Sequence, residues 1–387
     1  MTKPLEGLTV LDFSRVLAAP MATQILADLG ASVIKIERPG IGDETRSFEP
    51  QIGDGESAYF FAFNRGKKSV TLDLRSAEGR DAVLSLVRDV DVVVENFLPG
   101  AMERLGLGYD DLTAVNDKLV YVSATGFGQT GPERTRKGYD TIFQALSGVM
   151  SLTGHPGSGP AKVGVPIADM TSGLWIAIGI LTGLVGRGRH GIGTYVDLAM
   201  MDVQTSLLAL AAARVFALDE DPTRTGTQHP GRVPSAAFEC LDGWIHISGS
   251  DQHWIPLCES LGLFELARDD ELHTNAGRLQ NRQLVMKSLR EAIRGQERAD
   301  VVASLQGVGV PVGEVRSVRE ALDAPQTRAR GMVGQFDHPS AGTFRALRSP
   351  IKFNNYDDPE IVAPPVLGAD TDDVLRRGSR ASLEGDG

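Results

Sequence analysis

The first part of the chain alternates short apolar runs with stretches of helical periodicity, and this alternation restricts the fold more than any other feature. Residues 8–13 and 32–37 are apolar runs of strand length, and between them residues 20–30 repeat apolar side chains at helical spacing until Gly30. A strand, a helix and a strand within about 30 residues predict a βαβ unit. We therefore expect an α/β fold with a largely parallel sheet. The pattern returns at residues 69–74, 79–88, 90–95 and 119–123.

The turn after the first expected strand lacks the glycine-rich signature of dinucleotide-binding folds. Residues 12–20 read Asp-Phe-Ser-Arg-Val-Leu-Ala-Ala-Pro and contain no glycine, whereas that signature is GxGxxG. The chain also has no GxxxxGK[ST], HExxH or GxSxG motif, and none of its seven histidines lies two to four residues from another. These gaps disfavour NAD, flavin, phosphate-loop, hydrolase and metal chemistry, so we expect no metal site.

Composition limits the partners and the compartment. Asp and Glu number 50 against 39 Lys and Arg, a net charge of -11, which argues against a broad surface for nucleic acid or an anionic membrane. Two cysteines, Cys240 and Cys258, are too few for a disulfide framework. Lys3 and Glu6 interrupt any export signal, and residues 170–186 fall short of the ~20 that a membrane span needs. We expect a cytoplasmic protein with residues 170–186 as a buried helix.

A polar, loop-like stretch over residues 218–231 marks the expected domain boundary. Residues 1–217 are expected to form the large α/β domain. Residues 218–325 are expected to form a smaller α+β domain, with a hairpin over residues 238–248 in which Asp242-Gly243 suits a tight type I′ turn. Residues 326–387 are expected to be a C-terminal segment that packs back on the large domain.

Asp169 is the carboxylate with the greatest chemical promise, because it directly precedes the long apolar stretch. An aspartate at a helix start can accept backbone N–H bonds and is stabilised by the positive helix end, which keeps it ionised at neutral pH. Such a carboxylate can act as a nucleophile. From position alone, a simple helix cap is the more common role, and sequence spacing does not decide between the two.

Basic residues lie at or just after the ends of the expected strands. Ligands of open parallel sheets bind at the carboxyl ends of the strands, so these side chains can converge on a phosphorylated ligand. For any single one of them, a solvated surface position is the more common case. The residues are Arg38, Lys67, Lys68, Arg75 and Arg104, together with the run Arg134-Thr-Arg-Lys137.

Motifs along nearly the whole chain resemble those of the class III coenzyme A transferase family. The family includes formyl-CoA transferase, carnitine CoA-transferase, succinyl-CoA dicarboxylate CoA-transferases and α-methylacyl-CoA racemase. The resemblance implies a homodimer of interlocked, ring-like chains, each with a Rossmann-like large domain that binds coenzyme A and a smaller α+β domain. The matching segments are residues 5–20, 29–40, 64–69, 94–100, 125–132, 138–140, 191–197 and 364–368, together with Asp169.

The resemblance also implies roles for individual residues. Asp169 matches the catalytic aspartate, which forms a mixed anhydride with the acyl group and then an aspartyl-CoA thioester. Arg15 is a candidate contact for a second carboxylate of the acceptor, and His229, in the loop of residues 226–231, is a candidate substrate contact. Asp370 stands where the family commonly has histidine, and no role follows for it. The positions that match coenzyme A contacts are Val16, Arg38, Leu72, Arg75, Asn96, Phe97, Arg104 and Lys137.

By the same resemblance, Tyr139 is the second candidate catalytic residue. It also distinguishes transferases from racemases, which carry a histidine there. A tyrosine with a pKa near 10 is a poor two-way proton shuttle at neutral pH. We therefore expect an acyl-CoA:carboxylate CoA-transferase that moves coenzyme A from a donor such as succinyl-CoA to a small, dicarboxylic acid. The short loop at residues 226–231 disfavours oxalate or formyl specificity. The alternatives are a 2-methylacyl-CoA racemase and a CoA-binding protein without activity.

Overall fold

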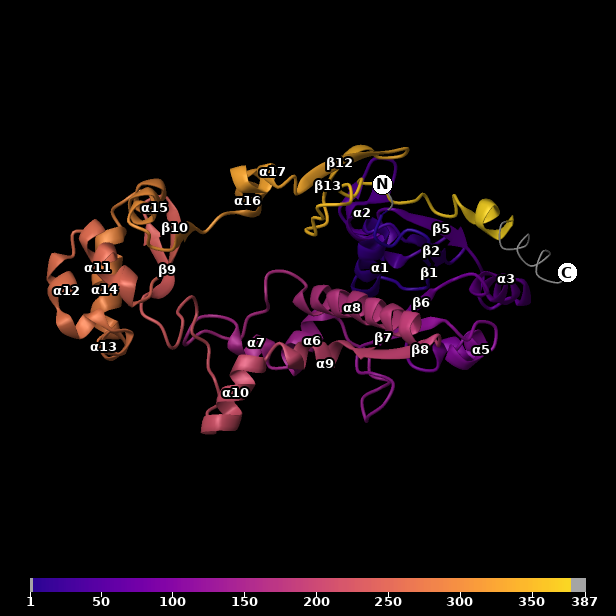
Figure 1. The fold of residues 1–387 in the computed structure, drawn as a ribbon, viewed down its shortest axis with the longest axis horizontal. Helices are drawn as coiled ribbons and strands as arrows, with labels where there is room; N and C mark the ends of the chain where they lie inside the picture. Colours follow the sequence, from indigo (N-terminus) through magenta and orange to yellow (C-terminus); the bar gives the residue numbers. More distant parts are fainter. Residues whose placement is uncertain (1–2, 377–387) are drawn as a thin grey trace. The chain divides into compact units, whose positions relative to one another are not determined.

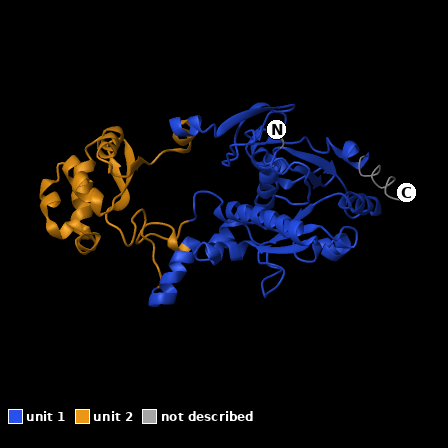
Figure 2. Cartoon of the chain, viewed as in Figure 1, with its two compact units in different colours: residues 1–150, 162–220, 325–387 blue, residues 151–161, 221–324 orange. Residues whose placement is uncertain are grey.

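The computed structural model describes residues 3–376 and divides the chain into two compact units. Unit 1 consists of residues 1–150, 162–220 and 325–387, and unit 2 of residues 151–161 and 221–324 (Figure 2). The sequence places the boundaries at 217/218 and 325/326, whereas the contacts within the units place them at 220/221 and 324/325. Residues 151–161 also pack with unit 2, a long-range association that no local sequence signal indicates.

A six-stranded parallel sheet forms the centre of unit 1, as the βαβ pattern predicts (Figure 1). Its order is β5-β2-β1-β6-β7-β8. The chain builds outward from β1 in one direction and then continues from β6 in the other, so the switch point between the two directions lies between β1 and β6. The strands are β1 Thr9–Asp12, β2 Ser32–Glu37, β5 Lys67–Thr71, β6 Val92–Glu95, β7 Val120–Thr125 and β8 Thr194–Ala199.

Both faces of this sheet are buried, which explains why its strands are almost continuously apolar. Successive side chains point to opposite faces. Val10 packs in a cluster with α1 and α8, and Leu11 packs in a second cluster with α3. The helices and short elements of unit 1 are α1 Ala18–Asp28, η1 Glu44–Ser47, β3 Gln51–Ile52, β4 Glu56–Ser57, α2 Ala58–Phe63, α3 Ala77–Val87, α4 Ala101–Arg104, α5 Tyr109–Thr113, α6 Asp140–Leu146, α8 Ile167–His190, α9 Met200–Ser206, α10 Ala209–Leu218, α17 Pro325–Ala329, β12 Val333–His338 and β13 Gly342–Leu347, with α7 Val149–Leu152 crossing into unit 2.

Helix α8 differs from its expected form. It has 24 residues rather than the 17 of the apolar stretch. It packs against α1, α6, α9, β7 and β8, but only part of its apolar surface is buried. By length and composition, α8 could cross a membrane, and so could α9 and α10 if that bent pair were one span. Core helices of water-soluble folds share this length and composition. The sequence therefore predicts the helix but misses its extent and its exposed apolar side.

Paired charges lie buried beneath the switch point. Asp12 accepts hydrogen bonds from the Lys67 Nζ (3.1 Å) and from the Ser14 backbone N–H (2.9 Å), and Lys35 Nζ contacts Asp43 at 2.9 Å and the Ser14 carbonyl at 2.6 Å. Burial acts to raise the pKa of Asp12, but the two lysines outweigh it and hold that pKa below its usual range. These side chains hold the glycine-free turn after β1.

Residues 368–371 of unit 1 lie along β5. Ser69 donates its N–H to the Asp370 carboxylate (2.9 Å), and the Asp370 N–H donates to the Ser69 carbonyl (3.0 Å). Gly368 N–H donates to Ser69 Oγ at 2.8 Å, and Thr71 N–H donates to Thr371 Oγ1 at 3.0 Å. Asp370, for which the sequence suggests no role, thus attaches the C-terminal segment to the sheet.

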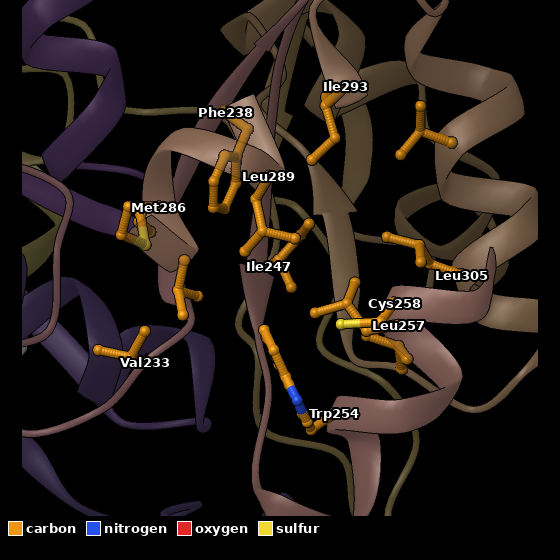
Figure 3. Close-up of a cluster of buried hydrophobic side chains, with 14 of the residues drawn as sticks. Val233, Phe238, Ile247, Trp254, Leu257, Cys258, Met286, Leu289, Ile293 and Leu305 are labelled. Atoms are coloured by element: carbon orange, nitrogen blue, oxygen red, sulfur yellow. The ribbon is translucent and has the colours of Figure 1, made fainter. Parts of the chain in front are cut away.

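Unit 2 is an α+β unit built on the antiparallel sheet β11-β10-β9, with its apolar core shown in Figure 3. The predicted hairpin is present, but its turn residues are Leu241 and Asp242, and Gly243 already belongs to β10. Neither turn residue has a positive φ, so the type I′ turn is wrong. Asp242 instead accepts the Arg298 N–H at 2.8 Å. The elements are β9 Ser235–Cys240, β10 Gly243–Ser248, α11 Asp251–Ser260, α12 Phe264–Arg268, η2 Asp270–His273, α13 Asn275–Gln280, α14 Arg282–Ile293, α15 Arg298–Gly307, β11 Val312–Glu314 and α16 Val318–Asp323.

Candidate functional site

Two adjoining cavities of about 530 and 370 Å³ open at the switch point of unit 1. Arg15, Glu44 and Phe97 line both of them. The structure brings most of the candidate residues to these cavities. Arg38, Leu72, Arg75 and Phe97 line the larger one, and Arg15, Val16, Asn96, Phe97, Lys137, Tyr139 and Asp169 line the smaller one.

Two candidates lie outside these linings. Arg104 is exposed at the end of α4, next to Leu105, which does line the larger cavity. His229 belongs to unit 2, where it is exposed and its Nδ1 accepts the Gly231 N–H at 3.1 Å. The sequence order of motifs suggests a common site for all of these residues, but order along the chain does not fix which side chains reach one cavity.

The Asn96 side chain joins the loop after β6 to the backbone of the loop after β1. Asn96 accepts the Arg15 N–H at 2.9 Å and donates its side-chain amide to the Arg15 carbonyl at 2.8 Å. The next residue, Val16, has a φ of 69°, a left-handed conformation that is strained for a β-branched side chain. Asn96 thus fixes the wall of the smaller cavity, beyond the ligand contact that the sequence suggests for it.

Arg15 lines both cavities and places a positive charge between them. Its guanidinium pairs with Glu44 at 2.9 Å and lies over the Phe97 ring, 5.0 Å from the centroid. Arg136, which also lines the smaller cavity, pairs with Glu133 and lies over the Phe127 ring, 5.5 Å from the centroid. Each arginine is only partly covered, so each can exchange its carboxylate partner for an anionic ligand at small cost.

Asp169 lies in the first turn of α8 and lines the smaller cavity, but it is not the helix cap. Pro166 is the N-cap residue, and the amides of Ala168 (2.8 Å) and Asp169 (3.4 Å) donate to Asp140 Oδ1. Within residues 3–376, no hydrogen bond reaches the Asp169 carboxylate. The expectation that backbone N–H groups hold it ionised is therefore wrong, because a second carboxylate takes those groups.

The pKa of Asp169 moves in the direction opposite to the expected one. Burial, assisted by the charge of Asp140, raises it from 3.8 to about 7. Burial, followed by the charge of Asp169 itself, also raises the pKa of Tyr59 to about 12, so this phenol stays protonated near the nucleophile candidate. Sequence reasoning missed Tyr59, although its hydroxyl is the one polar side-chain group within the run Ala58–Phe63.

Tyr139 is 78% exposed and precedes α6 as its N-cap residue. The smaller cavity is thus lined by an exposed phenol, a desolvated carboxylate and several cations, and it shares lining residues with the larger cavity. The larger cavity has apolar walls at Leu72 and Phe97 and cations at Arg38 and Arg75. An apolar wall with nearby cations can bind a phosphorylated nucleotide. The desolvated carboxylate in the adjoining cavity can then act as a nucleophile towards a group that the nucleotide carries.

Comparison with known proteins gives a consistent result. The sequence model of CoA-transferase family III matches residues 5–371. The succinyl-CoA:glutarate CoA-transferase of Mus musculus is 37% identical over 97% of this chain and 86% of its own length. The acetyl-CoA:oxalate CoA-transferase of Acetobacter aceti is 39% identical over 92% and 90%. A crystal structure of a CaiB/BaiF family protein from Brucella suis is 39% identical and has a TM-score of 0.88 over 98% of this chain and 100% of that chain.

The raised pKa of Asp169 predicts a pH-dependent stability difference for Asp169→Asn. Because the folded pKa of about 7 exceeds the ordinary 3.8, wild-type stability falls as the pH rises through this interval, whereas the neutral amide does not titrate. Between about pH 5 and about pH 8, the free energy of unfolding of the variant should gain about 3 kcal/mol on that of the wild type. Denaturant unfolding measures this difference. The exposed Asp81→Asn serves as the control, and an equal difference at both pH values would contradict the shift.

Proposed function

The chain belongs to CoA-transferase family III, and on this premise we propose that it moves coenzyme A from an acyl-CoA donor such as succinyl-CoA to a small dicarboxylic acid. The names of the relatives support this acceptor class, because glutarate and oxalate are both dicarboxylates. The oxalate relative also keeps oxalate among the acceptors to be tested, although the short loop at residues 226–231 disfavours it.

The position of Asp169 carries the proposal. Its carboxylate oxygen attacks the thioester carbonyl, the carbon–sulfur bond breaks, and the coenzyme A thiolate leaves a mixed anhydride. The thiolate then attacks the aspartyl carbonyl, which releases the donor acid as a carboxylate and forms an aspartyl-CoA thioester. The acceptor carboxylate attacks this thioester and again releases the thiolate. Thiolate attack on the acceptor's acyl carbon finally yields the new thioester and restores Asp169.

Coenzyme A would occupy the larger cavity and reach into the smaller one. Arg38 and Arg75 would pair with its phosphates, and Leu72 and Phe97 would pack against its adenine. Its thioester end would pass the strained Val16 towards Asp169. Arg104 and Lys137 are also proposed to contact the phosphates, and Asn96 is proposed to contact coenzyme A as well. His229 remains a proposed contact of the acceptor.

We also propose that two chains form the interlocked homodimer of the family. Unit 1 exposes large apolar side chains on α8 and α10, and Phe216 is 86% exposed. A patch of this kind indicates an interface. The chain also leaves unit 1 and returns to it, which is the connectivity that a closed, interlocking ring requires. The apolar residues include Leu174, Trp175 and Ile178 on α8, and Leu210 and Phe216 on α10.

Covalent catalysis predicts that Asp169 can be trapped. When the protein is mixed with succinyl-CoA and hydroxylamine, peptide mass spectrometry should find a hydroxamate at Asp169. Asp169→Ala should lose transfer activity by at least about a thousandfold, as expected for a lost nucleophile, whereas the exposed Asp81→Ala should retain it. A fully active Asp169→Ala variant would refute the mechanism. Acceptor-independent exchange of the α-proton of a 2-methylacyl-CoA with solvent deuterium would favour a racemase instead.

Arg15 should determine the preference for dicarboxylates. A hydrogen bond between a guanidinium and the distal carboxylate contributes about 1.5–3 kcal/mol, so Arg15→Gln should raise the KM for glutarate by roughly 10- to 100-fold. The KM for a monocarboxylate of equal length should not change. Arg136→Gln is the matched control from the same cavity. If that variant alone shows the loss, the second carboxylate binds there and not at Arg15.

The dimer predicts a solution mass of two chains by light scattering. Introducing charge at the exposed apolar patch with Leu210→Asp and Phe216→Asp should convert the protein to a monomer or a weaker dimer, because burying these carboxylates is unfavourable. Leu241→Asp, at the exposed turn of the unit 2 hairpin, is the control and should leave the mass unchanged. A monomeric wild-type protein would refute the proposed assembly.

A further inference from the structure

Asp140 connects α6 to the start of α8 through both of its carboxylate oxygens. Its Oδ1 accepts the amides of Ala168 and Asp169, and its Oδ2 accepts the Gln144 side-chain amide at 2.6 Å. The Gln144 side chain is buried, and its own oxygen accepts the Val163 N–H at 2.8 Å. Two side chains one turn apart on α6 therefore hold the segment that leads into α8, at both of its ends.

These contacts decide what surrounds the nucleophile. The first amides of a helix stabilise any anion that they reach, by hydrogen bonds and by the positive end of the helix dipole. Here they point to Asp140, so the Asp169 carboxylate lacks that stabilisation and also lies near a second negative charge. An anion that is less stabilised is a stronger nucleophile towards a carbonyl carbon.

We propose that Asp140 is a positioning residue of the transfer reaction: it holds the backbone of Asp169 and takes the α8 amides, which leaves the Asp169 carboxylate a weakly stabilised and reactive anion. This inference rests on the proposed function of Asp169. When Asp169 attacks the thioester, its oxygen–carbon bond forms, the carbon–sulfur bond breaks, and the negative charge moves to the departing sulfur. Acylation therefore removes the charge that faces Asp140, which favours the anhydride.

Other charged and titratable groups surround the same carboxylate and must be held constant in any test. Tyr59 on α2 stays neutral well above physiological pH, as its raised pKa shows. The groups that line the smaller cavity from the other elements are Arg15, Glu44, Arg136, Lys137 and Tyr139. Removing the carboxylate of Asp140 changes none of these residues, so a shift in the titration of Asp169 would report the Asp140 charge.

The test is the pH dependence of hydroxamate formation at Asp169 from succinyl-CoA in single turnover. In the wild type, the rate should rise with pH through the pKa of Asp169. In Asp140→Asn, the midpoint should move to lower pH by at least about half a unit, because a repelling charge is gone, and the plateau rate should fall several-fold. Asp140→Ala should lower the plateau further, because it also removes the acceptor for the Ala168 N–H.

Two further variants separate this role from a structural one. Asp111→Asn removes a carboxylate that accepts the Gly108 N–H at the start of α5, outside both cavity linings, and should leave the midpoint unchanged. If Asp140→Asn does not fold, Asp140→Ser keeps a neutral oxygen near the amides at the start of α8, and its midpoint should again lie below that of the wild type.

The outcomes distinguish the two proposals. If the wild type forms no hydroxamate at Asp169, the proposed function fails. If the wild type is trapped but the folded variants at position 140 keep its midpoint, even with a lower plateau, the residue has only a structural role and the inference about Asp140 is overturned.

Discussion

The buried charges of Asp12, Lys67, Lys35 and Asp43 hold the loop on which the rest of the site depends. Nucleotide-handling folds commonly turn after the first strand through glycines that let the backbone approach phosphate. This chain turns without glycine. Instead, two lysines and two carboxylates hold the loop through buried contacts, and Asn96 holds it from the loop after β6. Removing any one partner would leave an unpaired buried charge, which is strongly destabilising.

Much of the fold follows from local sequence patterns, and the misses have physical causes. Runs of apolar residues between helical segments predict the parallel sheet because both of its faces must be buried. The extent of α8 is missed because charged residues at its end, such as Arg187, still continue a helix when they reach solvent or a partner such as Asp91. The prediction places the hairpin turn one residue too late. Asp242 accepts the backbone amide at the start of α15, a residue far away in the sequence, and no local pattern indicates that contact.

The site shows the same division between local and long-range information. Sequence position identifies Asp169 and the basic residues at strand ends, because parallel strands end at one edge of a sheet. It cannot show that Asp140, 28 residues before Ala168, takes the amides that Asp169 would otherwise receive. Tyr59 is missed for a similar reason: its proximity to Asp169 comes from the packing of α2. The chemistry of the nucleophile therefore depends on contacts that only the folded chain reveals.

The attachment of the C-terminal segment to β5 also bears on solubility. β5 is the first strand of the sheet order, so one side of it has no neighbouring strand. The outward N–H and carbonyl of Ser69 are bonded to Asp370. An open strand edge is a template for pairing with other chains and for aggregation. The segment of residues 368–371 thus covers part of this edge. A truncation before Gly368 would expose an unpaired, aggregation-prone strand edge during synthesis and storage, although it would remove none of the residues that line the cavities.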